Sequence, residues 1–365
     1  MKKIVFGITC LELGGAERVL IDIVNNLVDK YDITIFTLYG KGDFLGQLND
    51  RVKVESMYNC KYDDLNKLEK LKMSLKMYNG ALRKLLYDKY IRGRYDVEIA
   101  FLEGPMTWIF STPSNTKKIA WVHNDIEKVF GEGKRAQLKK SLNVKAYNGY
   151  NKIVFVSKDN LDIFNSIYPN NKVDKLIIKN YIDKDIVLKR AEEKIDKLDH
   201  NVPCFVQVSR LVSQKGLYRL LDVHRELIDE GYEHKIYIVG DGPLKSDLQK
   251  LITEYNLLDS FILLGQKENP YPYIKDADYF ILTSLYEGYG MVVLEAEILG
   301  KYIMITDTAA REALDGYEYG MVVNNNFDGV FDGMKEIIKK KPKVSKKIVI
   351  DNESILKNII ELIEG

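Results

Sequence analysis

The chain has 365 residues, of which 46% are hydrophobic and 29% are charged, so it is long enough for two domains and is neither a low-complexity nor a disordered protein. Its net charge of +1 is the sum of a basic first half and an acidic second half. Residues 1–180 contain 30 Lys and Arg against 21 Asp and Glu, and residues 181–365 contain 24 Lys and Arg against 32 Asp and Glu. This asymmetry predicts different partners for the two halves, while the nearly neutral total and the lack of a recognition motif argue against nucleic acid.

The chain begins with KKIVFGI, a short apolar run that indicates a β-strand. Glu12 and Glu17 follow it too closely for a secretory signal, and no apolar run reaches the roughly 18 residues of a membrane-spanning helix. Three scattered cysteines without a CxxC pair argue against a disulfide framework and against a zinc site. We therefore expect a cytoplasmic protein that can still bind peripherally to the inner face of the cell membrane.

Apolar, β-branched runs alternate with amphipathic stretches along the whole chain. The strands predicted in the first half are KKIVFGI, YDITIFTLY, VKVESMY, DVEIAFL, KKIAWVH and NKIVFVS. Those predicted in the second half are CFVQVSR, HKIYIVGDG, SFILLGQ, DYFILTS, KYIMITD and GMVV. Helix-length stretches with a period near 3.6 lie between them, for example at 16–29, 64–90, 216–231, 243–256 and 291–299.

This alternation predicts an α/β fold made of two Rossmann-like, doubly wound parallel-sheet domains. We expect an N-terminal domain at 1–182, a charged linker at 183–201 and a C-terminal domain at 202–365. The last amphipathic stretch, 351–365, could pack on its own domain or cross back to the first. Ligands of such sheets bind beyond the carboxyl ends of the strands, so the informative residues are those that follow the strands.

The segment LTSLYEGYGMVVLEAEILG ends a strand and opens a helix near Met291. Gly288 and Gly290 allow the backbone to approach a ligand closely, and the start of the helix offers unpaired N–H groups to a diphosphate. The carboxylates of Glu287 and Glu295 suit the vicinal hydroxyls of a sugar or ribose. The alternative is that Glu295 is a solvated helical residue and that Glu287 only interacts with the helix dipole.

In CFVQVSRLVSQKGLYRLL, Arg210 follows a strand and Lys215 precedes a helix. Two cations at the rim of the same sheet could hold a diphosphate without a metal ion, although isolated residues at this spacing are more often surface charges. In the first half, Gly14 and Gly15 open a helix after the first strand, a weak signal on its own. His123 ends the strand KKIAWVH and either faces a ligand or is satisfied by local backbone.

Jointly these residues resemble glycosyltransferase family 4, the retaining group with the GT-B fold, in which two Rossmann-like domains face each other across a cleft. The resemblance covers nearly the whole chain. The matching segments, in order, are GGAER (14–18), WVH (121–123), VSRLVSQKG (208–216), VGDGP (239–243) and EGYGMVVLEA (287–296). The Glu-x7-Glu pair formed by Glu287 and Glu295 is the most recognisable of these marks.

The resemblance implies a role for each matching residue. Arg210 and Lys215 would bind the donor diphosphate, Glu287 the transferred sugar and Glu295 the ribose. The remaining positions would contact other parts of the donor. The backbone of Tyr289, Gly290, Met291 and Val292 would bind the distal phosphate, and Gly15 would lie against the diphosphate. His123 would contact the sugar, and the loop near Gln266 and Lys267 would contact the base. The reaction would be a retaining hexosyl transfer from a nucleotide-diphosphate sugar to a glycan or lipid-linked saccharide, without a metal or another cofactor.

The chain departs from the family pattern in two places, at Gly300-Lys301-Tyr302 and at Ala309-Ala310-Arg311-Glu312. The family's range suggests a role in bacterial surface polysaccharide synthesis. A nucleotide-sugar epimerase is a rival interpretation, which the Glu-x7-Glu pair disfavours. A non-catalytic accessory subunit is another, and it would be expected to lose some of the four charged residues that this chain retains.

Two basic segments in the first half suggest where the acceptor binds. Residues 61–96 carry Lys or Arg interleaved with Leu, Met and Tyr at helical spacing, and residues 133–145 add a second cluster. We expect this face to rest on an anionic membrane surface and to receive a polyprenyl-diphosphate-linked acceptor. The alternative is an ordinary solvated helix with an apolar stripe that faces the core.

Overall fold

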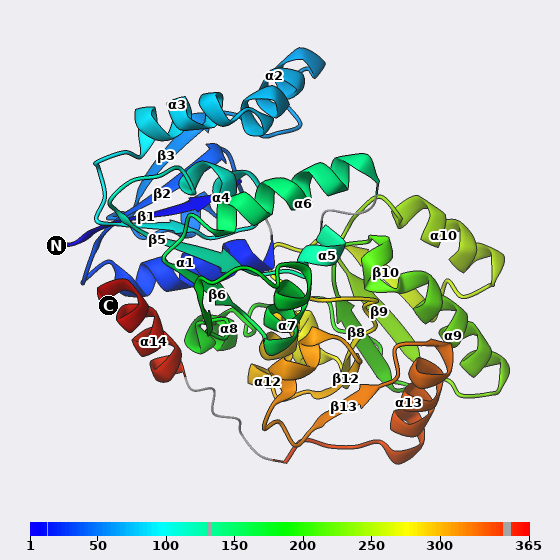
Figure 1. Ribbon diagram of the computed structural model, residues 1–365. Helices are drawn as coiled ribbons and strands as arrows, with labels where there is room; N and C mark the ends of the chain where they lie inside the picture. Colours follow the sequence, from blue (N-terminus) through cyan, green and yellow to red (C-terminus); the bar gives the residue numbers. More distant parts are fainter. Residues whose placement is uncertain (13, 130–132, 346–351) are drawn as a thin grey trace. The chain divides into compact units, whose positions relative to one another are not determined.

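The computed structural model describes residues 1–12, 14–129, 133–345 and 352–365. The chain divides into two compact units, one made of residues 1–181 and 352–365 and the other of residues 182–351. Each unit contains one parallel β-sheet with helices against it (Figure 1). The α/β fold class predicted from the alternation of strands and helices is therefore confirmed.

The first unit is built on a seven-stranded sheet in the order β3-β2-β1-β4-β5-β6-β7. Its strands are β1 (Lys3–Ile8), β2 (Asp32–Tyr39), β3 (Lys53–Tyr58), β4 (Val97–Ala100), β5 (Lys117–Val122), β6 (Lys152–Phe155) and β7 (Asp174–Ile177). Its helices are α1 (Gly15–Leu27), α2 (Lys67–Tyr78), α3 (Gly80–Tyr90), α4 (Pro105–Phe110), α5 (Ile126–Val129), α6 (Lys134–Tyr147), α7 (Lys158–Ile167) and α14 (Asn352–Glu364), with a 3-10 turn η1 at Leu45–Gln47. The strand β7 was not predicted, because this four-residue edge strand has two charged residues followed by only two apolar ones, too short a run to stand out.

The predicted helix at 64–90 is two helices rather than one. Asn79 ends α2 with an extended backbone, and its side-chain oxygen accepts hydrogen bonds from the N–H groups of Ala81 and Leu82. Asn66 caps α2 in the same way, with Glu69 completing a capping box. Because an asparagine cap satisfies the first N–H groups of a helix, Asn79 starts α3 where periodicity alone would have continued α2.

The C-terminal helix α14 belongs to the first unit, which decides between the two placements that the sequence left open. Its carboxylate Glu364 forms a salt bridge with Lys2 at 2.8 Å and accepts a hydrogen bond from the Tyr31 hydroxyl at 2.8 Å. The ammonium of Lys117 donates to the carbonyl of Leu362 at 2.7 Å. The apolar face of α14, which includes Ile359, is buried.

The second unit is built on a six-stranded parallel sheet in the order β10-β9-β8-β11-β12-β13. Its strands are β8 (Cys204–Val208), β9 (Lys235–Val239), β10 (Phe261–Gly265), β11 (Tyr279–Leu282), β12 (Tyr302–Thr306) and β13 (Gly320–Val323). Its helices are α8 (Lys184–Arg190), α9 (Leu217–Asp229), α10 (Lys245–Glu254), α11 (Tyr271–Asp276), α12 (Met291–Ile298) and α13 (Phe327–Lys340), with 3-10 turns η2 at Ser213–Lys215 and η3 at Ala309–Leu314. The first part of the segment expected as a linker, 183–201, forms α8 in this unit.

A chain of hydrogen bonds runs through two buried histidines of the second unit. Because the carbonyl oxygen of Tyr232 can only accept, His234 donates to it from Nδ1 (2.8 Å) and accepts at Nε2 from Nδ1 of His224 (2.8 Å). His224 then accepts at Nε2 from the Ser260 hydroxyl (2.8 Å). Both imidazoles are neutral in this arrangement. Burial lowers the pKa of His224 far below its ordinary value, and burial lowers the pKa of His234 to about 4.

We expect the free energy of unfolding to fall as the pH drops from 6.5 toward 4. The unfolded chain protonates His224 and His234 near their ordinary pKa, whereas the folded chain does not, so the unfolded state binds more protons in this window. The expected slope is about 1.4 kcal/mol per pH unit for each histidine. Urea unfolding at pH 7, 6 and 5 measures it, and replacing His234 with glutamine should reduce the slope. A free energy independent of pH over this range would contradict the prediction.

Among the helices within the described ranges, none is both long enough and apolar enough to cross a membrane.

Candidate functional site

The charged residues predicted for the donor site follow strands of the second sheet. Arg210 and Lys215 follow β8, and Glu287 follows β11, which is the neighbour of β8 in the sheet. All strand pairs of this sheet are parallel, so the ends of these strands lie at the same edge. The loops after β8 and β11 therefore meet, and the contacts between them define the candidate site.

An ion pair joins the two loops. The Lys215 ammonium lies 2.5 Å from Oε1 of Glu287, and the Ser284 hydroxyl donates to the same oxygen at 2.6 Å. The side chains of Lys215 and Glu287 are only 17% and 8% exposed, so the pair is largely removed from water. Oε2 of Glu287 accepts no hydrogen bond from a described residue, which leaves one carboxylate oxygen available to a ligand.

Gly216 and Gln207 hold the two loops together. Gly216 has a φ of +65°, and a Cβ atom there would lie 2.1 Å from the carbonyl oxygen of Thr283, so only glycine fits. The buried amide of Gln207 accepts hydrogen bonds from the backbone and hydroxyl of Thr283 and donates to the carbonyl of Lys215. Gln207 was not predicted from the sequence, although a polar residue inside the apolar run CFVQV was a usable signal.

Glu295 is 7% exposed, on the fifth residue of α12, and the Tyr271 hydroxyl lies 3.5 Å from its Oε1. The alternative interpretation of Glu295 as a solvated helical residue is therefore wrong. Glu287 is paired with Lys215, so an interaction with the helix dipole alone does not describe it either. Both carboxylates are buried, as is expected of groups that hold a specific partner rather than a solvated surface.

The start of α12 has the features of an anion site. Its cap is Gly290, with a φ of +76°, and no side chain of a described residue caps the first N–H groups. Tyr289 is buried, Met291 is nearly so, and Val292 is half-buried, while Gly288 precedes them in the loop. The free N–H groups and the positive end of the helix dipole favour a negatively charged ligand.

The other predicted residues of the second unit lie at the same strand ends. Arg210 is exposed, and no described residue forms a salt bridge with it. Gln266 is exposed directly after β10, and the Lys267 ammonium lies 5.5 Å from the centre of the Tyr273 ring. None of these three side chains is fixed by an ion pair with a described residue, which leaves them able to adjust to a ligand.

His123 lies in the first unit, at the end of β5. Its ring is 6% exposed, packs against Phe101 at 4.6 Å between ring centres and stacks on Trp121, and neither ring nitrogen has a hydrogen-bond partner among the described residues. Burial lowers the pKa of His123 to about 3, so the ring is neutral. Buried polar atoms are nearly always paired, so these nitrogens are candidates for a ligand. The alternative in which local backbone satisfies the ring is wrong for the described residues.

Glu103, which follows β4, positions the backbone around His123. Its Oε1 accepts hydrogen bonds from the N–H groups of His123 (2.5 Å) and Asn124 (2.6 Å). Burial raises the pKa of this carboxyl. Glu103 was not predicted from the sequence, because its partners follow the neighbouring strand β5 and only the sheet brings them together. Gly14 caps α1 with an extended backbone, and Gly15 is exposed at its first position.

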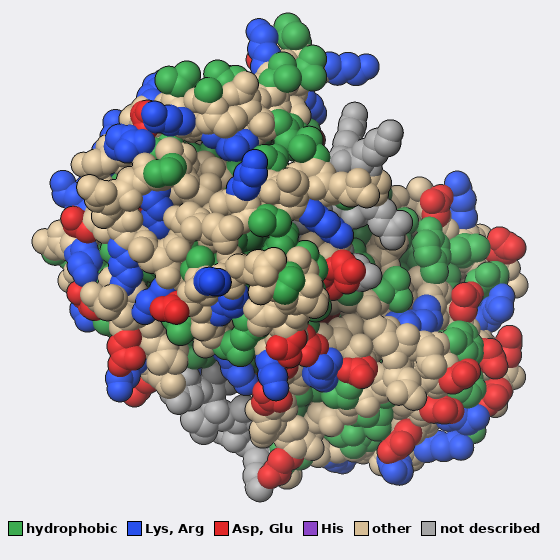
Figure 2. All heavy atoms as spheres, viewed as in Figure 1, with side chains coloured by type: hydrophobic (Ala, Val, Ile, Leu, Met, Phe, Trp, Pro, Cys, Tyr) green, Lys and Arg blue, Asp and Glu red, His purple; other side chains and the backbone are tan. Residues whose placement is uncertain are grey.

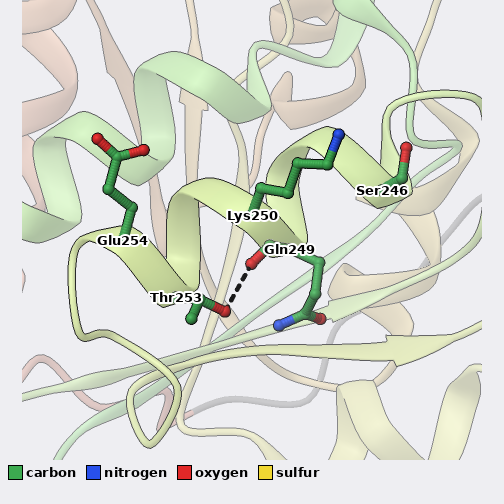
Figure 3. A pocket seen from close by; sticks show the side chains of 5 residues that line it. All are labelled: Ser246, Gln249, Lys250, Thr253 and Glu254. Atoms are coloured by element: carbon green, nitrogen blue, oxygen red, sulfur yellow. Dashed lines mark hydrogen bonds between the residues drawn. The ribbon is translucent and has the colours of Figure 1, made fainter.

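A shallow depression lies elsewhere, on the outer surface of the second unit. Its lining side chains all come from α10 and are all exposed, and Figure 3 shows them spread along the helix: Ser246, Gln249, Lys250, Thr253 and Glu254. The hydrogen bond drawn there joins the Thr253 hydroxyl to the carbonyl of Gln249 within the same helix. No predicted site residue lines this depression, and a single exposed helix face offers no convergent polar groups, so it is not the candidate site.

Comparisons with known proteins identify the domain that holds this site. The family of group 1 glycosyl transferases matches residues 189–352. The uncharacterized glycosyltransferase MJ1059 of Methanocaldococcus jannaschii is 31% identical over 56% of this chain, and the match covers 52% of that relative, so the chain spans about half of its length. An N-acetylgalactosaminyltransferase of Campylobacter jejuni that acts on N-acetylgalactosamine-N,N'-diacetylbacillosaminyl-diphospho-undecaprenol is 25% identical over 93% of this chain and 91% of its own length.

A solved structure agrees in fold along the whole chain. HepE of Anabaena, determined in complex with UDP and glucose, superposes with a TM-score of 0.75 at 17% identity and covers 99% of both chains. The glycosyltransferase resemblance inferred from the motifs is confirmed. Residues 189–352, which lie almost wholly in the second unit, match the family of group 1 glycosyl transferases, and the chain has the GT-B fold.

Proposed function

We propose that the chain transfers a hexosyl-type sugar, with retention, from a nucleoside-diphosphate sugar to a hydroxyl of a lipid-linked saccharide or glycan in bacterial surface polysaccharide synthesis. The observation that carries this proposal is the largely buried Lys215–Glu287 pair, in which Glu287 lies four residues before the start of α12. It combines a cation for a diphosphate with a carboxylate for sugar hydroxyls. The Campylobacter relative, named for a diphospho-undecaprenol acceptor, and the HepE complex with UDP and glucose support it.

The cations and the helix start would hold the diphosphate. Lys215 has three N–H donors and uses one on Glu287, so it retains donors for a phosphate. Arg210 offers a bidentate guanidinium, and the N–H groups of residues 289–292 would bind the distal phosphate. Negative charge builds up on the diphosphate as it departs. Positive groups held at that place therefore stabilise the transition state most and accelerate the reaction. No metal ion is needed in this arrangement, because the protein itself supplies the positive charge.

The carboxylates would orient the rest of the donor. The free Oε2 of Glu287 would accept hydrogen bonds from the transferred sugar, and Glu295 would accept them from the ribose. His123 would bind a sugar hydroxyl through its unpaired ring nitrogens, Gly14 and Gly15 would line the diphosphate, and Gln266 and Lys267 would flank the base. The acceptor hydroxyl would attack on the face of the leaving group, whose phosphate takes the proton. Positioning and charge stabilisation are both large terms in such a reaction.

A thermal-shift screen tests the donor assignment. UDP, GDP, ADP, dTDP and CMP are compared, and one nucleotide should raise the unfolding midpoint selectively, because a ligand that binds only the folded state stabilises it. The variants Arg210→Ala and Glu295→Ala should abolish the shift, whereas Lys250→Ala on the outer face of α10 should keep it. No shift with any nucleotide at millimolar concentration would favour an accessory subunit. Free nucleotide or an isomerised sugar formed without any acceptor would favour an epimerase.

We further infer that α2 rests on an anionic membrane surface near the acceptor. The helix buries Met73 and Met77 against its own unit, but its leucines at 68, 71 and 75 are 59%, 57% and 59% exposed. At 100° per residue these three leucines share one face, opposite to the methionines. Helix α2 therefore has two apolar faces, which an ordinary solvated helix does not.

Lysines flank the exposed leucines. Lys67 and Lys72 lie on either side of the stripe and are exposed, and α3 adds Leu85, which is 63% exposed, next to Lys84 and Lys89. Figure 2 shows hydrophobic and Lys or Arg side chains together over α2 at the top of the view. An apolar stripe bordered by lysines matches the boundary between acyl chains and anionic headgroups. In the second basic segment, 133–145, the side chains of residues 134 and 135 lie outside the described ones.

Co-sedimentation with vesicles tests this surface. The chain should bind vesicles that contain anionic lipid at low salt, and replacing Leu71 and Leu75 with serine should reduce binding by about tenfold or more, since each buried CH₂ contributes about 0.8 kcal/mol. The matched control is Leu258→Ser, an equally exposed leucine (54%) in the second unit. Equal binding by all three proteins, or none by the parent chain, would contradict the inference.

A further inference from the structure

A cluster of potential metal ligands lies at the opposite edge of the second sheet, where the strands begin. Cys204 is the first residue of β8, and Asp278 directly precedes β11. Two hydrogen bonds link these residues: the N–H of Cys204 donates to the side-chain Oδ2 of Asp278 (2.9 Å), and the N–H of Asp278 donates to the carbonyl of Cys204 (3.1 Å). His200 precedes Cys204 by four residues and turns its ring toward both.

The separations within this cluster suit a shared cation. Nδ1 of His200 lies 3.6 Å from Sγ of Cys204 and 3.4 Å from Oδ1 of Asp278. The distance to Oδ1 is longer than a good N–H···O hydrogen bond of about 2.9–3.0 Å, whereas the distance to Sγ is also that of a hydrogen bond to sulfur. Zinc bonds of about 2.0–2.3 Å in a tetrahedron place neighbouring ligand atoms about 3.3–3.8 Å apart. One ligand atom from each of the three residues lies within 4.8 Å of the others.

The other side of the His200 ring faces a second carboxylate. Its Nε2 lies 3.5 Å from Oδ2 of Asp276, which also accepts a hydrogen bond from the N–H of Leu198 at 2.8 Å. Histidines that bind a metal through one nitrogen commonly donate the other N–H to a carboxylate, which fixes the tautomer and the ring orientation. Asp276 is therefore in the place of such an orienting group, and it cannot reach a cation bound at Nδ1.

We propose that His200 Nδ1, Cys204 Sγ and Asp278 Oδ1 bind a zinc ion, with Asp276 orienting the histidine and a water molecule at the fourth position. Thiolate, imidazole and carboxylate are the ligands of zinc in proteins, and a softer ligand set than oxygen alone excludes magnesium. Burial raises the pKa of the Cys204 thiol to about 12, so the thiol is neutral without a cation, and its proton leaves to solvent when zinc binds.

This zinc ion would fasten the segment 191–203 to the sheet. That segment connects α8 to β8 and is already attached by Asp199, which pairs with Lys235 at 2.6 Å. A zinc ion would add a bond between its last residues and the start of β11, at the sheet edge opposite the residues proposed for the donor. The ion would therefore raise thermal stability without taking part in glycosyl transfer.

The Asp-x-Asp sequence of residues 276–278 and the His-x3-Cys sequence of residues 200–204 are both readable in the chain. The expectation of no zinc site rested on cysteine pairs, and this set contains a single cysteine. Only the pairing of β8 with β11 brings the two short sequences together.

Metal titration tests the proposal. It uses the full chain without an affinity tag, after a chelator has removed any bound metal. Zn²⁺ should bind with a stoichiometry of one and raise the unfolding midpoint. Co²⁺ should give the visible bands of a tetrahedral site and a sulfur-to-cobalt charge-transfer band. The variants His200→Gln and Asp278→Asn should abolish tight binding, and Asp276→Asn should weaken it about 10- to 100-fold.

The matched control is Cys60→Ser, a half-buried cysteine in the first unit, which should bind Zn²⁺ and Co²⁺ like the parent. The side chains of His200 and Asp278 are 38% and 40% exposed, so their variants should fold even if a variant of buried Cys204 does not. Unchanged Zn²⁺ binding in both variants, or a cobalt spectrum without the thiolate band, would overturn the proposal. Neither readout uses a nucleotide or an acceptor, so a failure here leaves the proposed transferase function untouched.

Discussion

Replacing Lys215 with alanine is expected to reduce kcat/KM for glycosyl transfer about 10²- to 10³-fold. The ammonium is 17% exposed and lies 2.5 Å from Glu287, so the variant would lose a preorganised positive charge where the diphosphate departs. It would also leave the Glu287 carboxylate, only 8% exposed, without its counter-ion. Initial rates with the donor identified by the thermal-shift screen measure the effect.

Two further variants separate these contributions. Lys245→Ala is the matched control, because Lys245 also follows a strand of the second sheet and forms an ion pair, with Asp241 at 2.7 Å, but its side chain is 49% exposed. It should retain nearly full activity. Glu287→Gln keeps the shape of the side chain and removes its charge, and it should lower activity without the stability loss of Lys215→Ala. Equal rates for Lys215→Ala and Lys245→Ala would refute the role of Lys215.

Replacing Gly216 with alanine is expected to destabilise the second unit by about 3 kcal/mol or more, a loss typical of overpacking combined with backbone strain. The added Cβ would lie 2.1 Å from the carbonyl oxygen of Thr283, which is backbone and cannot move aside without disturbing β11. The φ of +65° adds strain for any residue with a Cβ. Urea unfolding compares the variant with the parent chain, and activity should be lost together with stability.

Gly231→Ala isolates the backbone strain from the steric clash. Gly231 has a φ of +84°, but a Cβ there would have no atom within 4 Å, so this variant should lose only about 1–2 kcal/mol. The difference between the two variants then measures how tightly the loop after β8 packs against the end of β11. Similar losses in both would show that this close approach does not hold the site together.

The sequence by itself predicted the charged centre of the candidate site. Arg210, Lys215 and Glu287 could be found because they follow apolar runs, and the carboxyl ends of parallel strands share one edge. The resemblance of the second unit to glycosyltransferases could also be found from the sequence, since its motifs are short and continuous in the chain. Local sequence patterns are sufficient to predict a site residue when the order of the strands also determines which residues lie near it.

Residues that act through distant partners were not found in this way. Gln207 joins Lys215 to Thr283, and Glu103 holds the backbone of His123, but Thr283 and His123 follow neighbouring strands that are distant in the sequence. The sequence also could not show which polar side chains are buried. The spacing of Glu295 fits both a solvated and a buried helical position, and only the packing of α12 removes its carboxylate from water. The exposed leucines of α2 show the reverse: these apolar residues recur at helical spacing, yet the structure leaves them outside the core.

The sequence alone determined the two parallel-sheet units, the glycosyltransferase resemblance and the loops that carry the candidate site, because hydrophobic periodicity and glycine positions act over a few residues. The tertiary structure decided that the 64–90 segment is two helices, that α14 returns to the first unit, and that His200, Cys204 and Asp278 meet. The physical reason is that these outcomes depend on which strands pair and which faces are buried. Contacts between residues far apart in the chain set both, and no local pattern encodes them.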